Sequence, residues 1–201
     1  AYFTATNIAT GSQFIIGPTN NRGYAVSQED MPYGSYKLVE TVFPKNYTYS
    51  GTKEWNVTIS SANDGIVTIQ AVNQLKKGHI EILKSDAESG KDLSGAEFTV
   101  YDSKGTAVTV IGPTNANGYA KSGEITYGSY TVKETKEPTH YYQEENKSWS
   151  VTLNDDSPLI TLDIANLRKY GSVKITKTAE DSLIENLKFE LIGTSVYGDE
   201  I

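Results

Sequence analysis

Apolar and polar residues alternate along most of the chain, and short clusters of Gly, Asn, Asp and Pro interrupt the alternation. Because successive side chains of an extended segment point to opposite faces, this pattern predicts β-strands. Turn clusters such as "TNANG" and "NDDSP" mark the strand ends. In the best-defined region the pattern predicts strands at 79–86, 96–103, 106–111, 117–122, 128–136, 147–153 and 159–166. Short strands in this number, without a helical period, are typical of an immunoglobulin-like β-sandwich.

The pattern occurs more than once. "AYFTATN" at 1 matches "AEFTVYD" at 96, "IGPTNNRGYA" at 16 matches "IGPTNANGYA" at 111, and "PYGSYKLVETVFPKNY" at 32 matches "TYGSYTVKETKEPTHY" at 126. "GHIEILKSD" at 78 recurs as "GSVKITKTAED" at 171. The matched segments lie 93 to 95 residues apart, and repetition at a nearly constant spacing indicates tandem modules. We predict an all-β chain with a first module at 1–77 that lacks its first strand, a complete module at 78–169, and the opening strands of a third at 170–201.

Three strands of the second repeat continue an inward apolar series with a polar residue: Lys84, Glu134 and Asn166. The preceding residues on the same faces are Ile80 and Ile82; Tyr130 and Val132; Ile160, Leu162 and Ile164. A position near a strand end, where the polar group reaches water, would explain one such residue. The Glu and Asn positions recur in the first repeat as Glu40 and Asn73, and Asn73 continues the alternation of Val67, Ile69 and Ala71. The Lys position recurs near the end of the chain as Lys177, which continues the alternation of Val173 and Ile175. Recurrence of all three favours a buried Lys–Glu–Asn cluster.

Such a cluster has a specific chemistry. Burial disfavours charge, so it lowers the pKa of a lysine and raises the pKa of a glutamic acid. A neutral amine is a nucleophile, and a protonated carboxyl group can polarise the amide of an asparagine and transfer protons. Contact between the groups supplies a high effective concentration. We therefore predict an isopeptide crosslink between Lys84 and Asn166, with loss of ammonia and with Glu134 as the assisting acid–base group.

The same residues point to a family. "GHIEILKSDAESGKDLSGAEFTVYD", "TNANGYA", "YGSYTVKETKEPTHYY" and "ITLDIAN" together resemble a Cna B-type domain, a transthyretin-like module of Gram-positive surface adhesins and pilins. The resemblance implies a Lys84–Asn166 crosslink assisted by Glu134, and a location outside the cell on a wall-anchored surface protein. Through the repeat it gives Glu40 the same assisting role.

The crosslinking residues of the flanking repeats are incomplete. Asn73 and Lys177 have no partner of the required type within their own repeats. One alternative stays open, in which Lys177 reaches Asn73 of another molecule by donation of a strand.

Composition narrows the remaining classes. A net charge of -7 provides no basic surface for nucleic acid. The chain has no cysteine and two histidines, so no disulfide, cofactor or metal site is expected. It contains no long apolar run, and we expect no membrane insertion of this fragment. Nothing resembles a Ser-His-Asp set or a glycine-rich phosphate loop, so catalysis on external substrates is not expected.

Two functions fit these observations. The first is a structural stalk in which neighbouring modules of one chain are partners and isopeptide bonds provide stiffness. The alternative is an adhesin module whose exposed loops, such as "YTYSG", "HYYQEEN" or "NDDSP", contact a host matrix protein or glycan.

Overall fold

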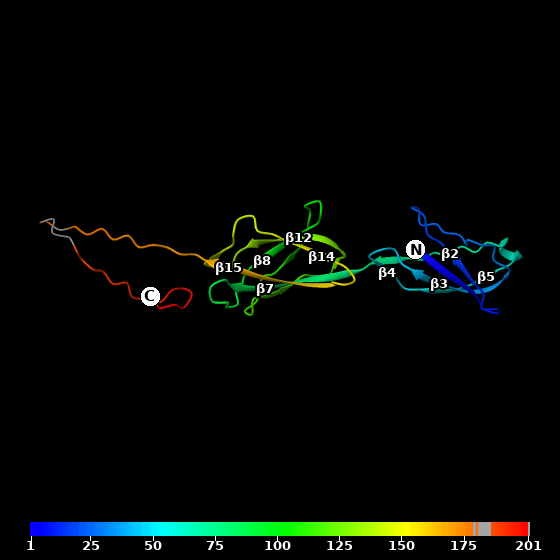
Figure 1. Cartoon of the computed structure of the whole chain (residues 1–201), viewed down its shortest axis with the longest axis horizontal. Helices are drawn as coiled ribbons and strands as arrows, with labels where there is room; N and C mark the ends of the chain where they lie inside the picture. Colours follow the sequence, from blue (N-terminus) through cyan, green and yellow to red (C-terminus); the bar gives the residue numbers. More distant parts are fainter. Residues whose placement is uncertain (179, 181–185, 201) are drawn as a thin grey trace. The chain divides into compact units, whose positions relative to one another are not determined.

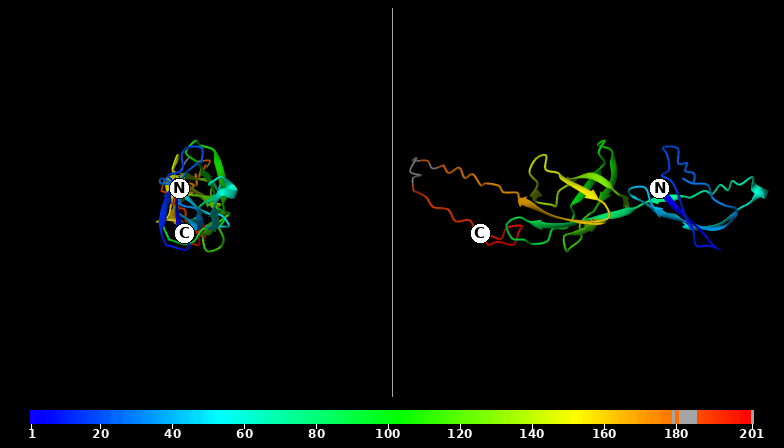
Figure 2. Two further views of the ribbon diagram at one scale, coloured as in Figure 1. Left: turned by 90° about the vertical axis from the view of Figure 1, so that its right-hand side faces the viewer. Right: turned by 45° about the vertical axis from the view of Figure 1, so that its right-hand side comes forward.

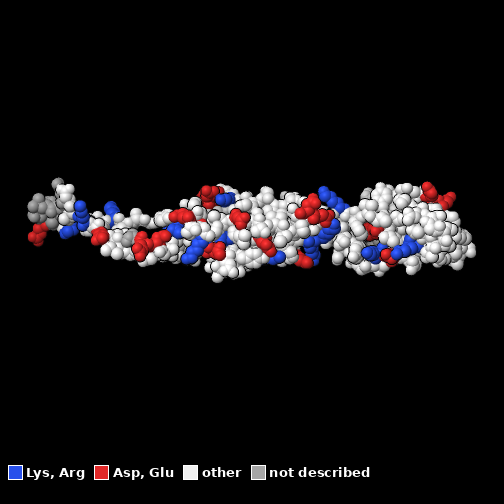
Figure 3. Space-filling model, turned by 60° about the horizontal axis from the view of Figure 1, so that its bottom comes forward, with Lys and Arg blue, Asp and Glu red and all other residues white. Residues whose placement is uncertain are grey.

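The computed structural model describes residues 1–178, 180 and 186–200, and these residues form an all-β protein. They contain fifteen strands, one short 3-10 helix at Ser61–Asn63 and no α-helix. The prediction of an all-β fold is confirmed. On the face drawn in Figure 3, acidic and basic side chains are interspersed, and no large patch of one sign forms.

The chain divides into two compact units. Unit 1 contains Ala1–His79 together with Glu124–Ser129 and Thr152–Leu159. Unit 2 contains Ile80–Gly123, Tyr130–Val151 and the chain from Ile160 onward.

The first repeat forms a four-stranded sheet and a separate strand pair. Its strands are β1 (Tyr2–Asn7), β2 (Gln13–Ile16), β3 (Gly34–Val42), β4 (Tyr47–Tyr49), β5 (Glu54–Ile59) and β6 (Asn73–Leu75). The sheet has the order β2-β1-β3-β5, and β4 pairs with β6. Alternate side chains of β1 and β3 form its buried core, namely Phe3, Ala5, Tyr36 and Leu38.

The second repeat forms two sheets, visible in the middle of the chain in Figure 1. Its strands are β7 (Lys77–Asp86), β8 (Glu97–Tyr101), β9 (Ala107–Ile111), β10 (Tyr119–Lys121), β11 (Ile125–Thr126), β12 (Gly128–Lys136), β13 (Tyr141–Tyr142), β14 (Trp149–Leu153) and β15 (Leu159–Arg168). One sheet has the order β14-β12-β8-β9, and the other has the order β10-β7-β15-β13, with β11 also paired to β7. All seven predicted strands are present, with shifted ends, whereas the two-residue strands β11 and β13 were not predicted.

The strands β7 and β15 run in parallel. The His79 N–H donates to the Pro158 carbonyl at 3.0 Å, and the Ala87 N–H donates to the Asn166 carbonyl at 3.0 Å. From the first bond to the second, the donor moves from residue 79 to residue 87 and the acceptor from residue 158 to residue 166. Both residue numbers rise together, as they do only in a parallel pair. The first and last long strands of the second repeat are therefore neighbours in one sheet.

Two predicted strands are absent from the described chain. The residues 66–72, expected to place Val67, Ile69 and Ala71 on a buried face, form no strand, and Val67 is exposed. In the second repeat the equivalent residues belong to β15, which pairs with β7. No described strand pairs with 66–72, although the Val72 carbonyl at its end accepts from the Ser50 N–H at 3.0 Å. The residues 171–178, expected to open a third module, likewise form no strand and are all exposed.

Candidate functional site

Lys84 lies in the interior of the second repeat. Its side chain on β7 follows Ile80 and Ile82 on the inward face, and its exposed fraction is 1%. Backbone bonds hold it from both sides, because its N–H donates to the Gly118 carbonyl at 2.8 Å and its carbonyl accepts from the Leu93 N–H at 2.9 Å. The predicted burial of this lysine is therefore what the structure has.

The other two predicted residues meet each other in the same interior. Asn166 on β15 is fully buried, and its Nδ2 donates to Glu134 Oε1 on β12 at 2.9 Å. Lys84 Nζ donates to the Ile164 carbonyl at 3.1 Å. Ile164 precedes Asn166 by two residues on the same strand and faces the same side, so the amine lies along the inward face of β15 that also bears the amide.

The interior changes the acid–base properties of the amine and the acid. Burial lowers the pKa of Lys84 from 10.5 to about 8, and the Glu134 carboxylate offsets part of the effect. Burial also raises the pKa of Glu134, opposed by Lys84 and by the hydrogen bond from Asn166. The pair is thus shifted toward a neutral amine and a neutral acid, which are the forms that aminolysis of an amide requires.

Three buried side-chain atoms among the described residues lack a hydrogen-bond partner, and all three belong to an Asn–Glu pair. They are Asn166 Oδ1, Glu134 Oε2 and Asn73 Oδ1. Buried polar atoms are nearly always paired, so each exception needs an explanation. They gather at the predicted crosslinking residues, which are therefore the candidate site.

The first repeat contains a matching pair without a lysine. Asn73 Nδ2 donates to Glu40 Oε1 at 2.9 Å, the same distance as in the second repeat. Glu40 has an exposed fraction of 5%. Lys177 lies on an exposed segment and its Nζ donates to the carbonyl of its neighbour Thr178 at 3.2 Å. The structure brings Glu40 and Asn73 together and does not bring Lys177 to them.

A β-bulge beside each glutamate was missed by reasoning from sequence. Glu134 is opposite Phe98, but the register shifts immediately afterwards, which leaves Thr135 as the extra residue. The same shift follows Glu40, with Thr41 as the extra residue. Bulges re-aim side chains and recur next to functional sites. The signal available in the sequence was the dipeptide Glu-Thr, which occurs at the same place in both repeats.

A second buried charged cluster was also missed. Asp86 at the end of β7 is 1% exposed and accepts from Arg168 Nε at 2.8 Å and from the Tyr141 hydroxyl at 3.2 Å. Burial would raise the pKa of Asp86, but hydrogen bonds from Glu88 N–H, the Ser89 hydroxyl and Arg168 outweigh it and lower the pKa to about 2. This carboxylate is fully satisfied, in contrast to Glu134, and its role is structural.

Comparison with known proteins gives the family. The model for the SpaA prealbumin-like fold domain matches residues 6–75 and 78–168, which follow the two repeats. The chain belongs to this family. The expected transthyretin-like, Cna B-like character is thereby confirmed.

The chain is also similar to individual proteins. The trypsin-resistant surface T6 protein of Streptococcus pyogenes serotype M6 is 36% identical over 121 residues, which are 60% of this chain and 22% of that protein. The chain therefore spans about a fifth of this relative. The solved structure of the Bacillus anthracis TIE protein matches with a TM-score of 0.64 and 24% identity over 84% of this chain and 31% of that one, which shows a shared fold. A C-terminal fragment of the pilus adhesin SpaC from Lactobacillus rhamnosus GG matches with a TM-score of 0.49 and 18% identity over 86% of this chain and 91% of that one.

None of the described residues belongs to a helix long and apolar enough to cross a bilayer. No group of three or more His, Asp or Glu side chains within the described part of the chain is arranged to hold a metal ion.

Proposed function

We propose that the SpaA-type domains of this chain form a structural segment of a Gram-positive surface protein, and that a Lys84–Asn166 isopeptide bond stiffens the second repeat. The observation that supports this most directly is the buried Lys84 with its lowered pKa, next to an Asn–Glu pair that leaves buried oxygens unpaired. The module boundaries predicted from the sequence, at 1–77, 78–169 and 170–201, are part of this proposal.

The bond would form without an external catalyst. Neutral Lys84 Nζ attacks Asn166 Cγ, so the Nζ–Cγ bond forms while the Cγ–Nδ2 bond breaks. Glu134 in its acid form donates to the carbonyl oxygen that develops negative charge, which requires the amide group to turn so that Oδ1 faces the carboxyl. Glu134 then relays the Nζ proton to Nδ2, and ammonia leaves. Proton and atom counts balance, and no oxidant or cofactor is consumed.

The crosslink would close a loop between Lys84 and Asn166, which are 82 positions apart in the sequence. By analogy with disulfide loop entropy, closure of a loop of this size contributes about 4–5 kcal/mol to stability. The chain contains no cysteine, so this stabilisation would be independent of redox conditions.

The relatives support the setting of this proposal. One relative is named as a trypsin-resistant surface protein of a Gram-positive organism. A surface protein experiences proteases and tension, and a covalent tie between the first and last long strands of a domain opposes both. We propose the same location, outside the cell on the wall, for this chain.

Intact-mass measurement of the purified chain tests the crosslink. We expect a mass below the calculated value by one molecule of ammonia, and a tryptic fragment in which the peptides of Lys84 and Asn166 are joined. Lys84→Met, which replaces the buried amine by an apolar chain of similar volume, should restore the full calculated mass for its sequence. The control Lys91→Met alters an exposed lysine of the same repeat and should retain the ammonia loss. A wild-type chain at its full calculated mass would overturn the proposal.

A further inference from the structure

The hydroxyl of Thr135 bridges two strands of the second repeat, directly after Glu134. Its Oγ1 donates to the Glu97 carbonyl at 3.3 Å and lies 3.2 Å from Thr99 Oγ1, and both partners belong to β8. Since a hydroxyl has a single proton, Thr99 is then the donor of the second bond. The two strands lie in the green and yellow-green part of the chain in Figure 2. The extra residue of the β-bulge is thus tied to the neighbouring strand by its own side chain.

The first repeat contains the same bridge directly after Glu40. Thr41 Oγ1 donates to the Tyr2 carbonyl at 3.3 Å and accepts from Thr4 Oγ1 at 3.5 Å. Both partners belong to β1 and lie two residues apart, as the partners on β8 do. The same three groups, two threonine hydroxyls and one backbone carbonyl, therefore meet beside each glutamate of the site.

The bulge makes Glu134 the last inward side chain of β12. Strict alternation would place Lys136 on the same face as Glu134, in the interior. Thr135 and Lys136 instead lie opposite the single residue Glu97, so Lys136 returns to the outer face, where its Nζ lies 2.6 Å from Glu97 Oε1. In the first repeat Val42 is likewise turned outward and is 52% exposed. Each bulge therefore ends the inward series at the carboxyl group.

The threonine bridge is the contact that both bulges share. The ion pair between Lys136 and Glu97 is largely exposed to solvent, and pairs of this kind contribute little. The residues at the same places in the first repeat are Val42 and Tyr2, which form no ion pair. The recurring feature beside each Glu–Asn pair is therefore the hydroxyl, and a recurring contact is the better candidate for a role at the site.

We propose that Thr135 and Thr41 are positioning residues, each of which fixes the bulge that holds the preceding glutamate against its asparagine. The glutamate Oε1 lies 2.9 Å from the asparagine Nδ2 in both repeats. An acid–base group must stay within hydrogen-bond reach of the atoms that it serves, so a small displacement slows the step. The effect on ammonia loss rests on the proposed function, whereas the placement of the carboxyl group is measurable without any reaction.

The rate of ammonia loss tests the role of Thr135. Chains from cell-free synthesis are stopped in denaturant at intervals, and intact mass gives the crosslinked fraction. Thr135→Val keeps the shape and removes the hydroxyl, and it should slow the loss about tenfold, a part of what an acid–base group contributes. Thr135→Ser restores the hydroxyl and should react at close to the wild-type rate. The matched control Thr131→Val, on the same outer face of β12, should also react normally.

Two results of this experiment would overturn the proposal. The first is a wild-type rate in Thr135→Val, which would show that the hydroxyl is dispensable. The second is a rate in Thr135→Ser as slow as in Thr135→Val, which would assign the effect to the methyl group.

A second readout does not require the reaction. In the Lys84→Met background the Asn166 side-chain amide is retained, and its NMR resonances report the hydrogen bond to Glu134. Adding Thr135→Val should move these resonances upfield, as expected for a weakened hydrogen bond, while adding Thr131→Val should leave them in place. Unchanged resonances in both double variants would contradict the positioning role.

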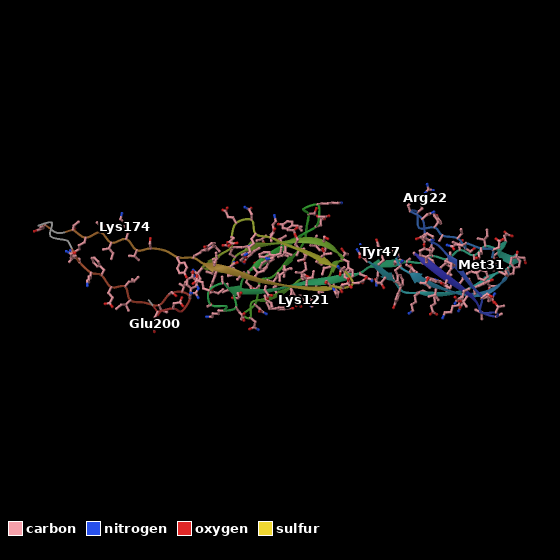
Figure 4. The ribbon with its side chains drawn as sticks, in the orientation of Figure 1. Arg22, Met31, Tyr47, Lys121, Lys174 and Glu200 are labelled. Carbon is pink, nitrogen blue, oxygen red and sulfur yellow. The ribbon has the colours of Figure 1, made fainter. Side chains whose placement is uncertain are left out.

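The first repeat provides an independent copy of this measurement in an otherwise unaltered chain. Asn73 lies opposite Tyr49 on β4, the strand that begins at Tyr47, which is labelled in Figure 4. Thr41→Val should move the side-chain amide resonances of Asn73 upfield, and Thr41→Ser should leave them in place. Resonances that do not move in Thr41→Val would overturn the proposal. A wild-type chain at its full calculated mass would count against the proposed function, and the amide resonances would still decide the role of the threonines.

Discussion

At the scale of single residues, the second repeat contains a lysine whose burial is costly unless it reacts. Removal of an ammonium group from water disfavours its charged form, and the Lys84 pKa of about 8 expresses that cost. Crosslinking would convert the amine into a neutral amide and remove the titrating group. The same burial that destabilises the unreacted chain therefore drives the proposed reaction.

This cost predicts an unusual pH dependence in a chain that cannot crosslink. In Asn166→Ala, Lys84 should titrate near 8 in the folded state and near 10.5 in the unfolded state. Between these values the unfolded state binds more protons, so the free energy of unfolding should rise with pH, by about 3 kcal/mol in total. Below pH 8 both states are protonated and the full penalty of burial is present. Urea unfolding of Asn166→Ala between pH 7 and 10 measures the slope.

The double variant Lys84→Met/Asn166→Ala supplies the baseline for this experiment. It lacks the buried amine but retains every other titrating group, so subtraction of its pH profile isolates Lys84. Identical profiles for the single and double variants would show that Lys84 has an ordinary pKa in the folded chain, and the proposed nucleophile would lose its physical basis.

At the scale of strands, positioning of the site depends on the backbone around β7. Gly118 adopts a φ of 66°, which side chains rarely tolerate, and its carbonyl accepts from the Lys84 N–H. A Cβ built on Gly118 would lie 2.2 Å from the Lys84 carbonyl oxygen. The close approach of β10 to β7 therefore requires glycine at this position.

Substitution of this glycine should move the nucleophile. We expect Gly118→Ala to displace β7 at Lys84, to lower stability by about 1–3 kcal/mol through backbone strain, and to slow or prevent the loss of ammonia. Gly123→Ala is the matched control, since no atom lies within 4 Å of its added Cβ and its φ is not in the left-handed region. Intact mass as a function of time after refolding measures the crosslink, and thermal unfolding measures stability. Normal crosslinking in Gly118→Ala would refute the positioning role.

The strand scale also shows what could be predicted from sequence. The alternation of inward and outward side chains along each strand was sufficient to place Lys84, Glu134 and Asn166 in one interior. This alternation is a local property of an extended chain and can be followed in the sequence. It failed at 66–72, where the apolar alternation is equally clear but no described strand offers hydrogen bonds. A segment forms a β-strand only when a neighbouring strand provides backbone hydrogen bonds. The sequence of the segment itself does not show whether such a neighbour is present.

Other features depended on contacts that a single strand does not reveal. The bulges at Thr135 and Thr41 arise from the register between two strands, and the strand β13 of two residues is too short to give a periodic signal. The Ile164 carbonyl that accepts from Lys84 belongs to the backbone, so no side-chain pattern could identify it.

At the scale of the whole molecule, the proposed bond changes the path of tension through the second repeat. Tension applied to the chain enters through β7 and leaves through β15, and these neighbouring parallel strands bear the two residues of the proposed crosslink. Without the bond, the load is resisted by hydrogen bonds between strands. With the bond, it passes directly from Lys84 to Asn166, and the residues between them lie outside the loaded path.

Single-molecule extension should therefore separate the crosslinked chain from its variant. We expect unfolding of the wild-type second repeat to release no length from the 81 residues between Lys84 and Asn166, at any force that leaves covalent bonds intact. Lys84→Met should release this segment, which adds roughly 280 Å of contour length at about 3.4 Å per residue. The control Lys91→Met should behave as the wild type. If the wild-type chain releases the same length as Lys84→Met, the second repeat bears load through hydrogen bonds alone, and the segment is an ordinary extensible tether.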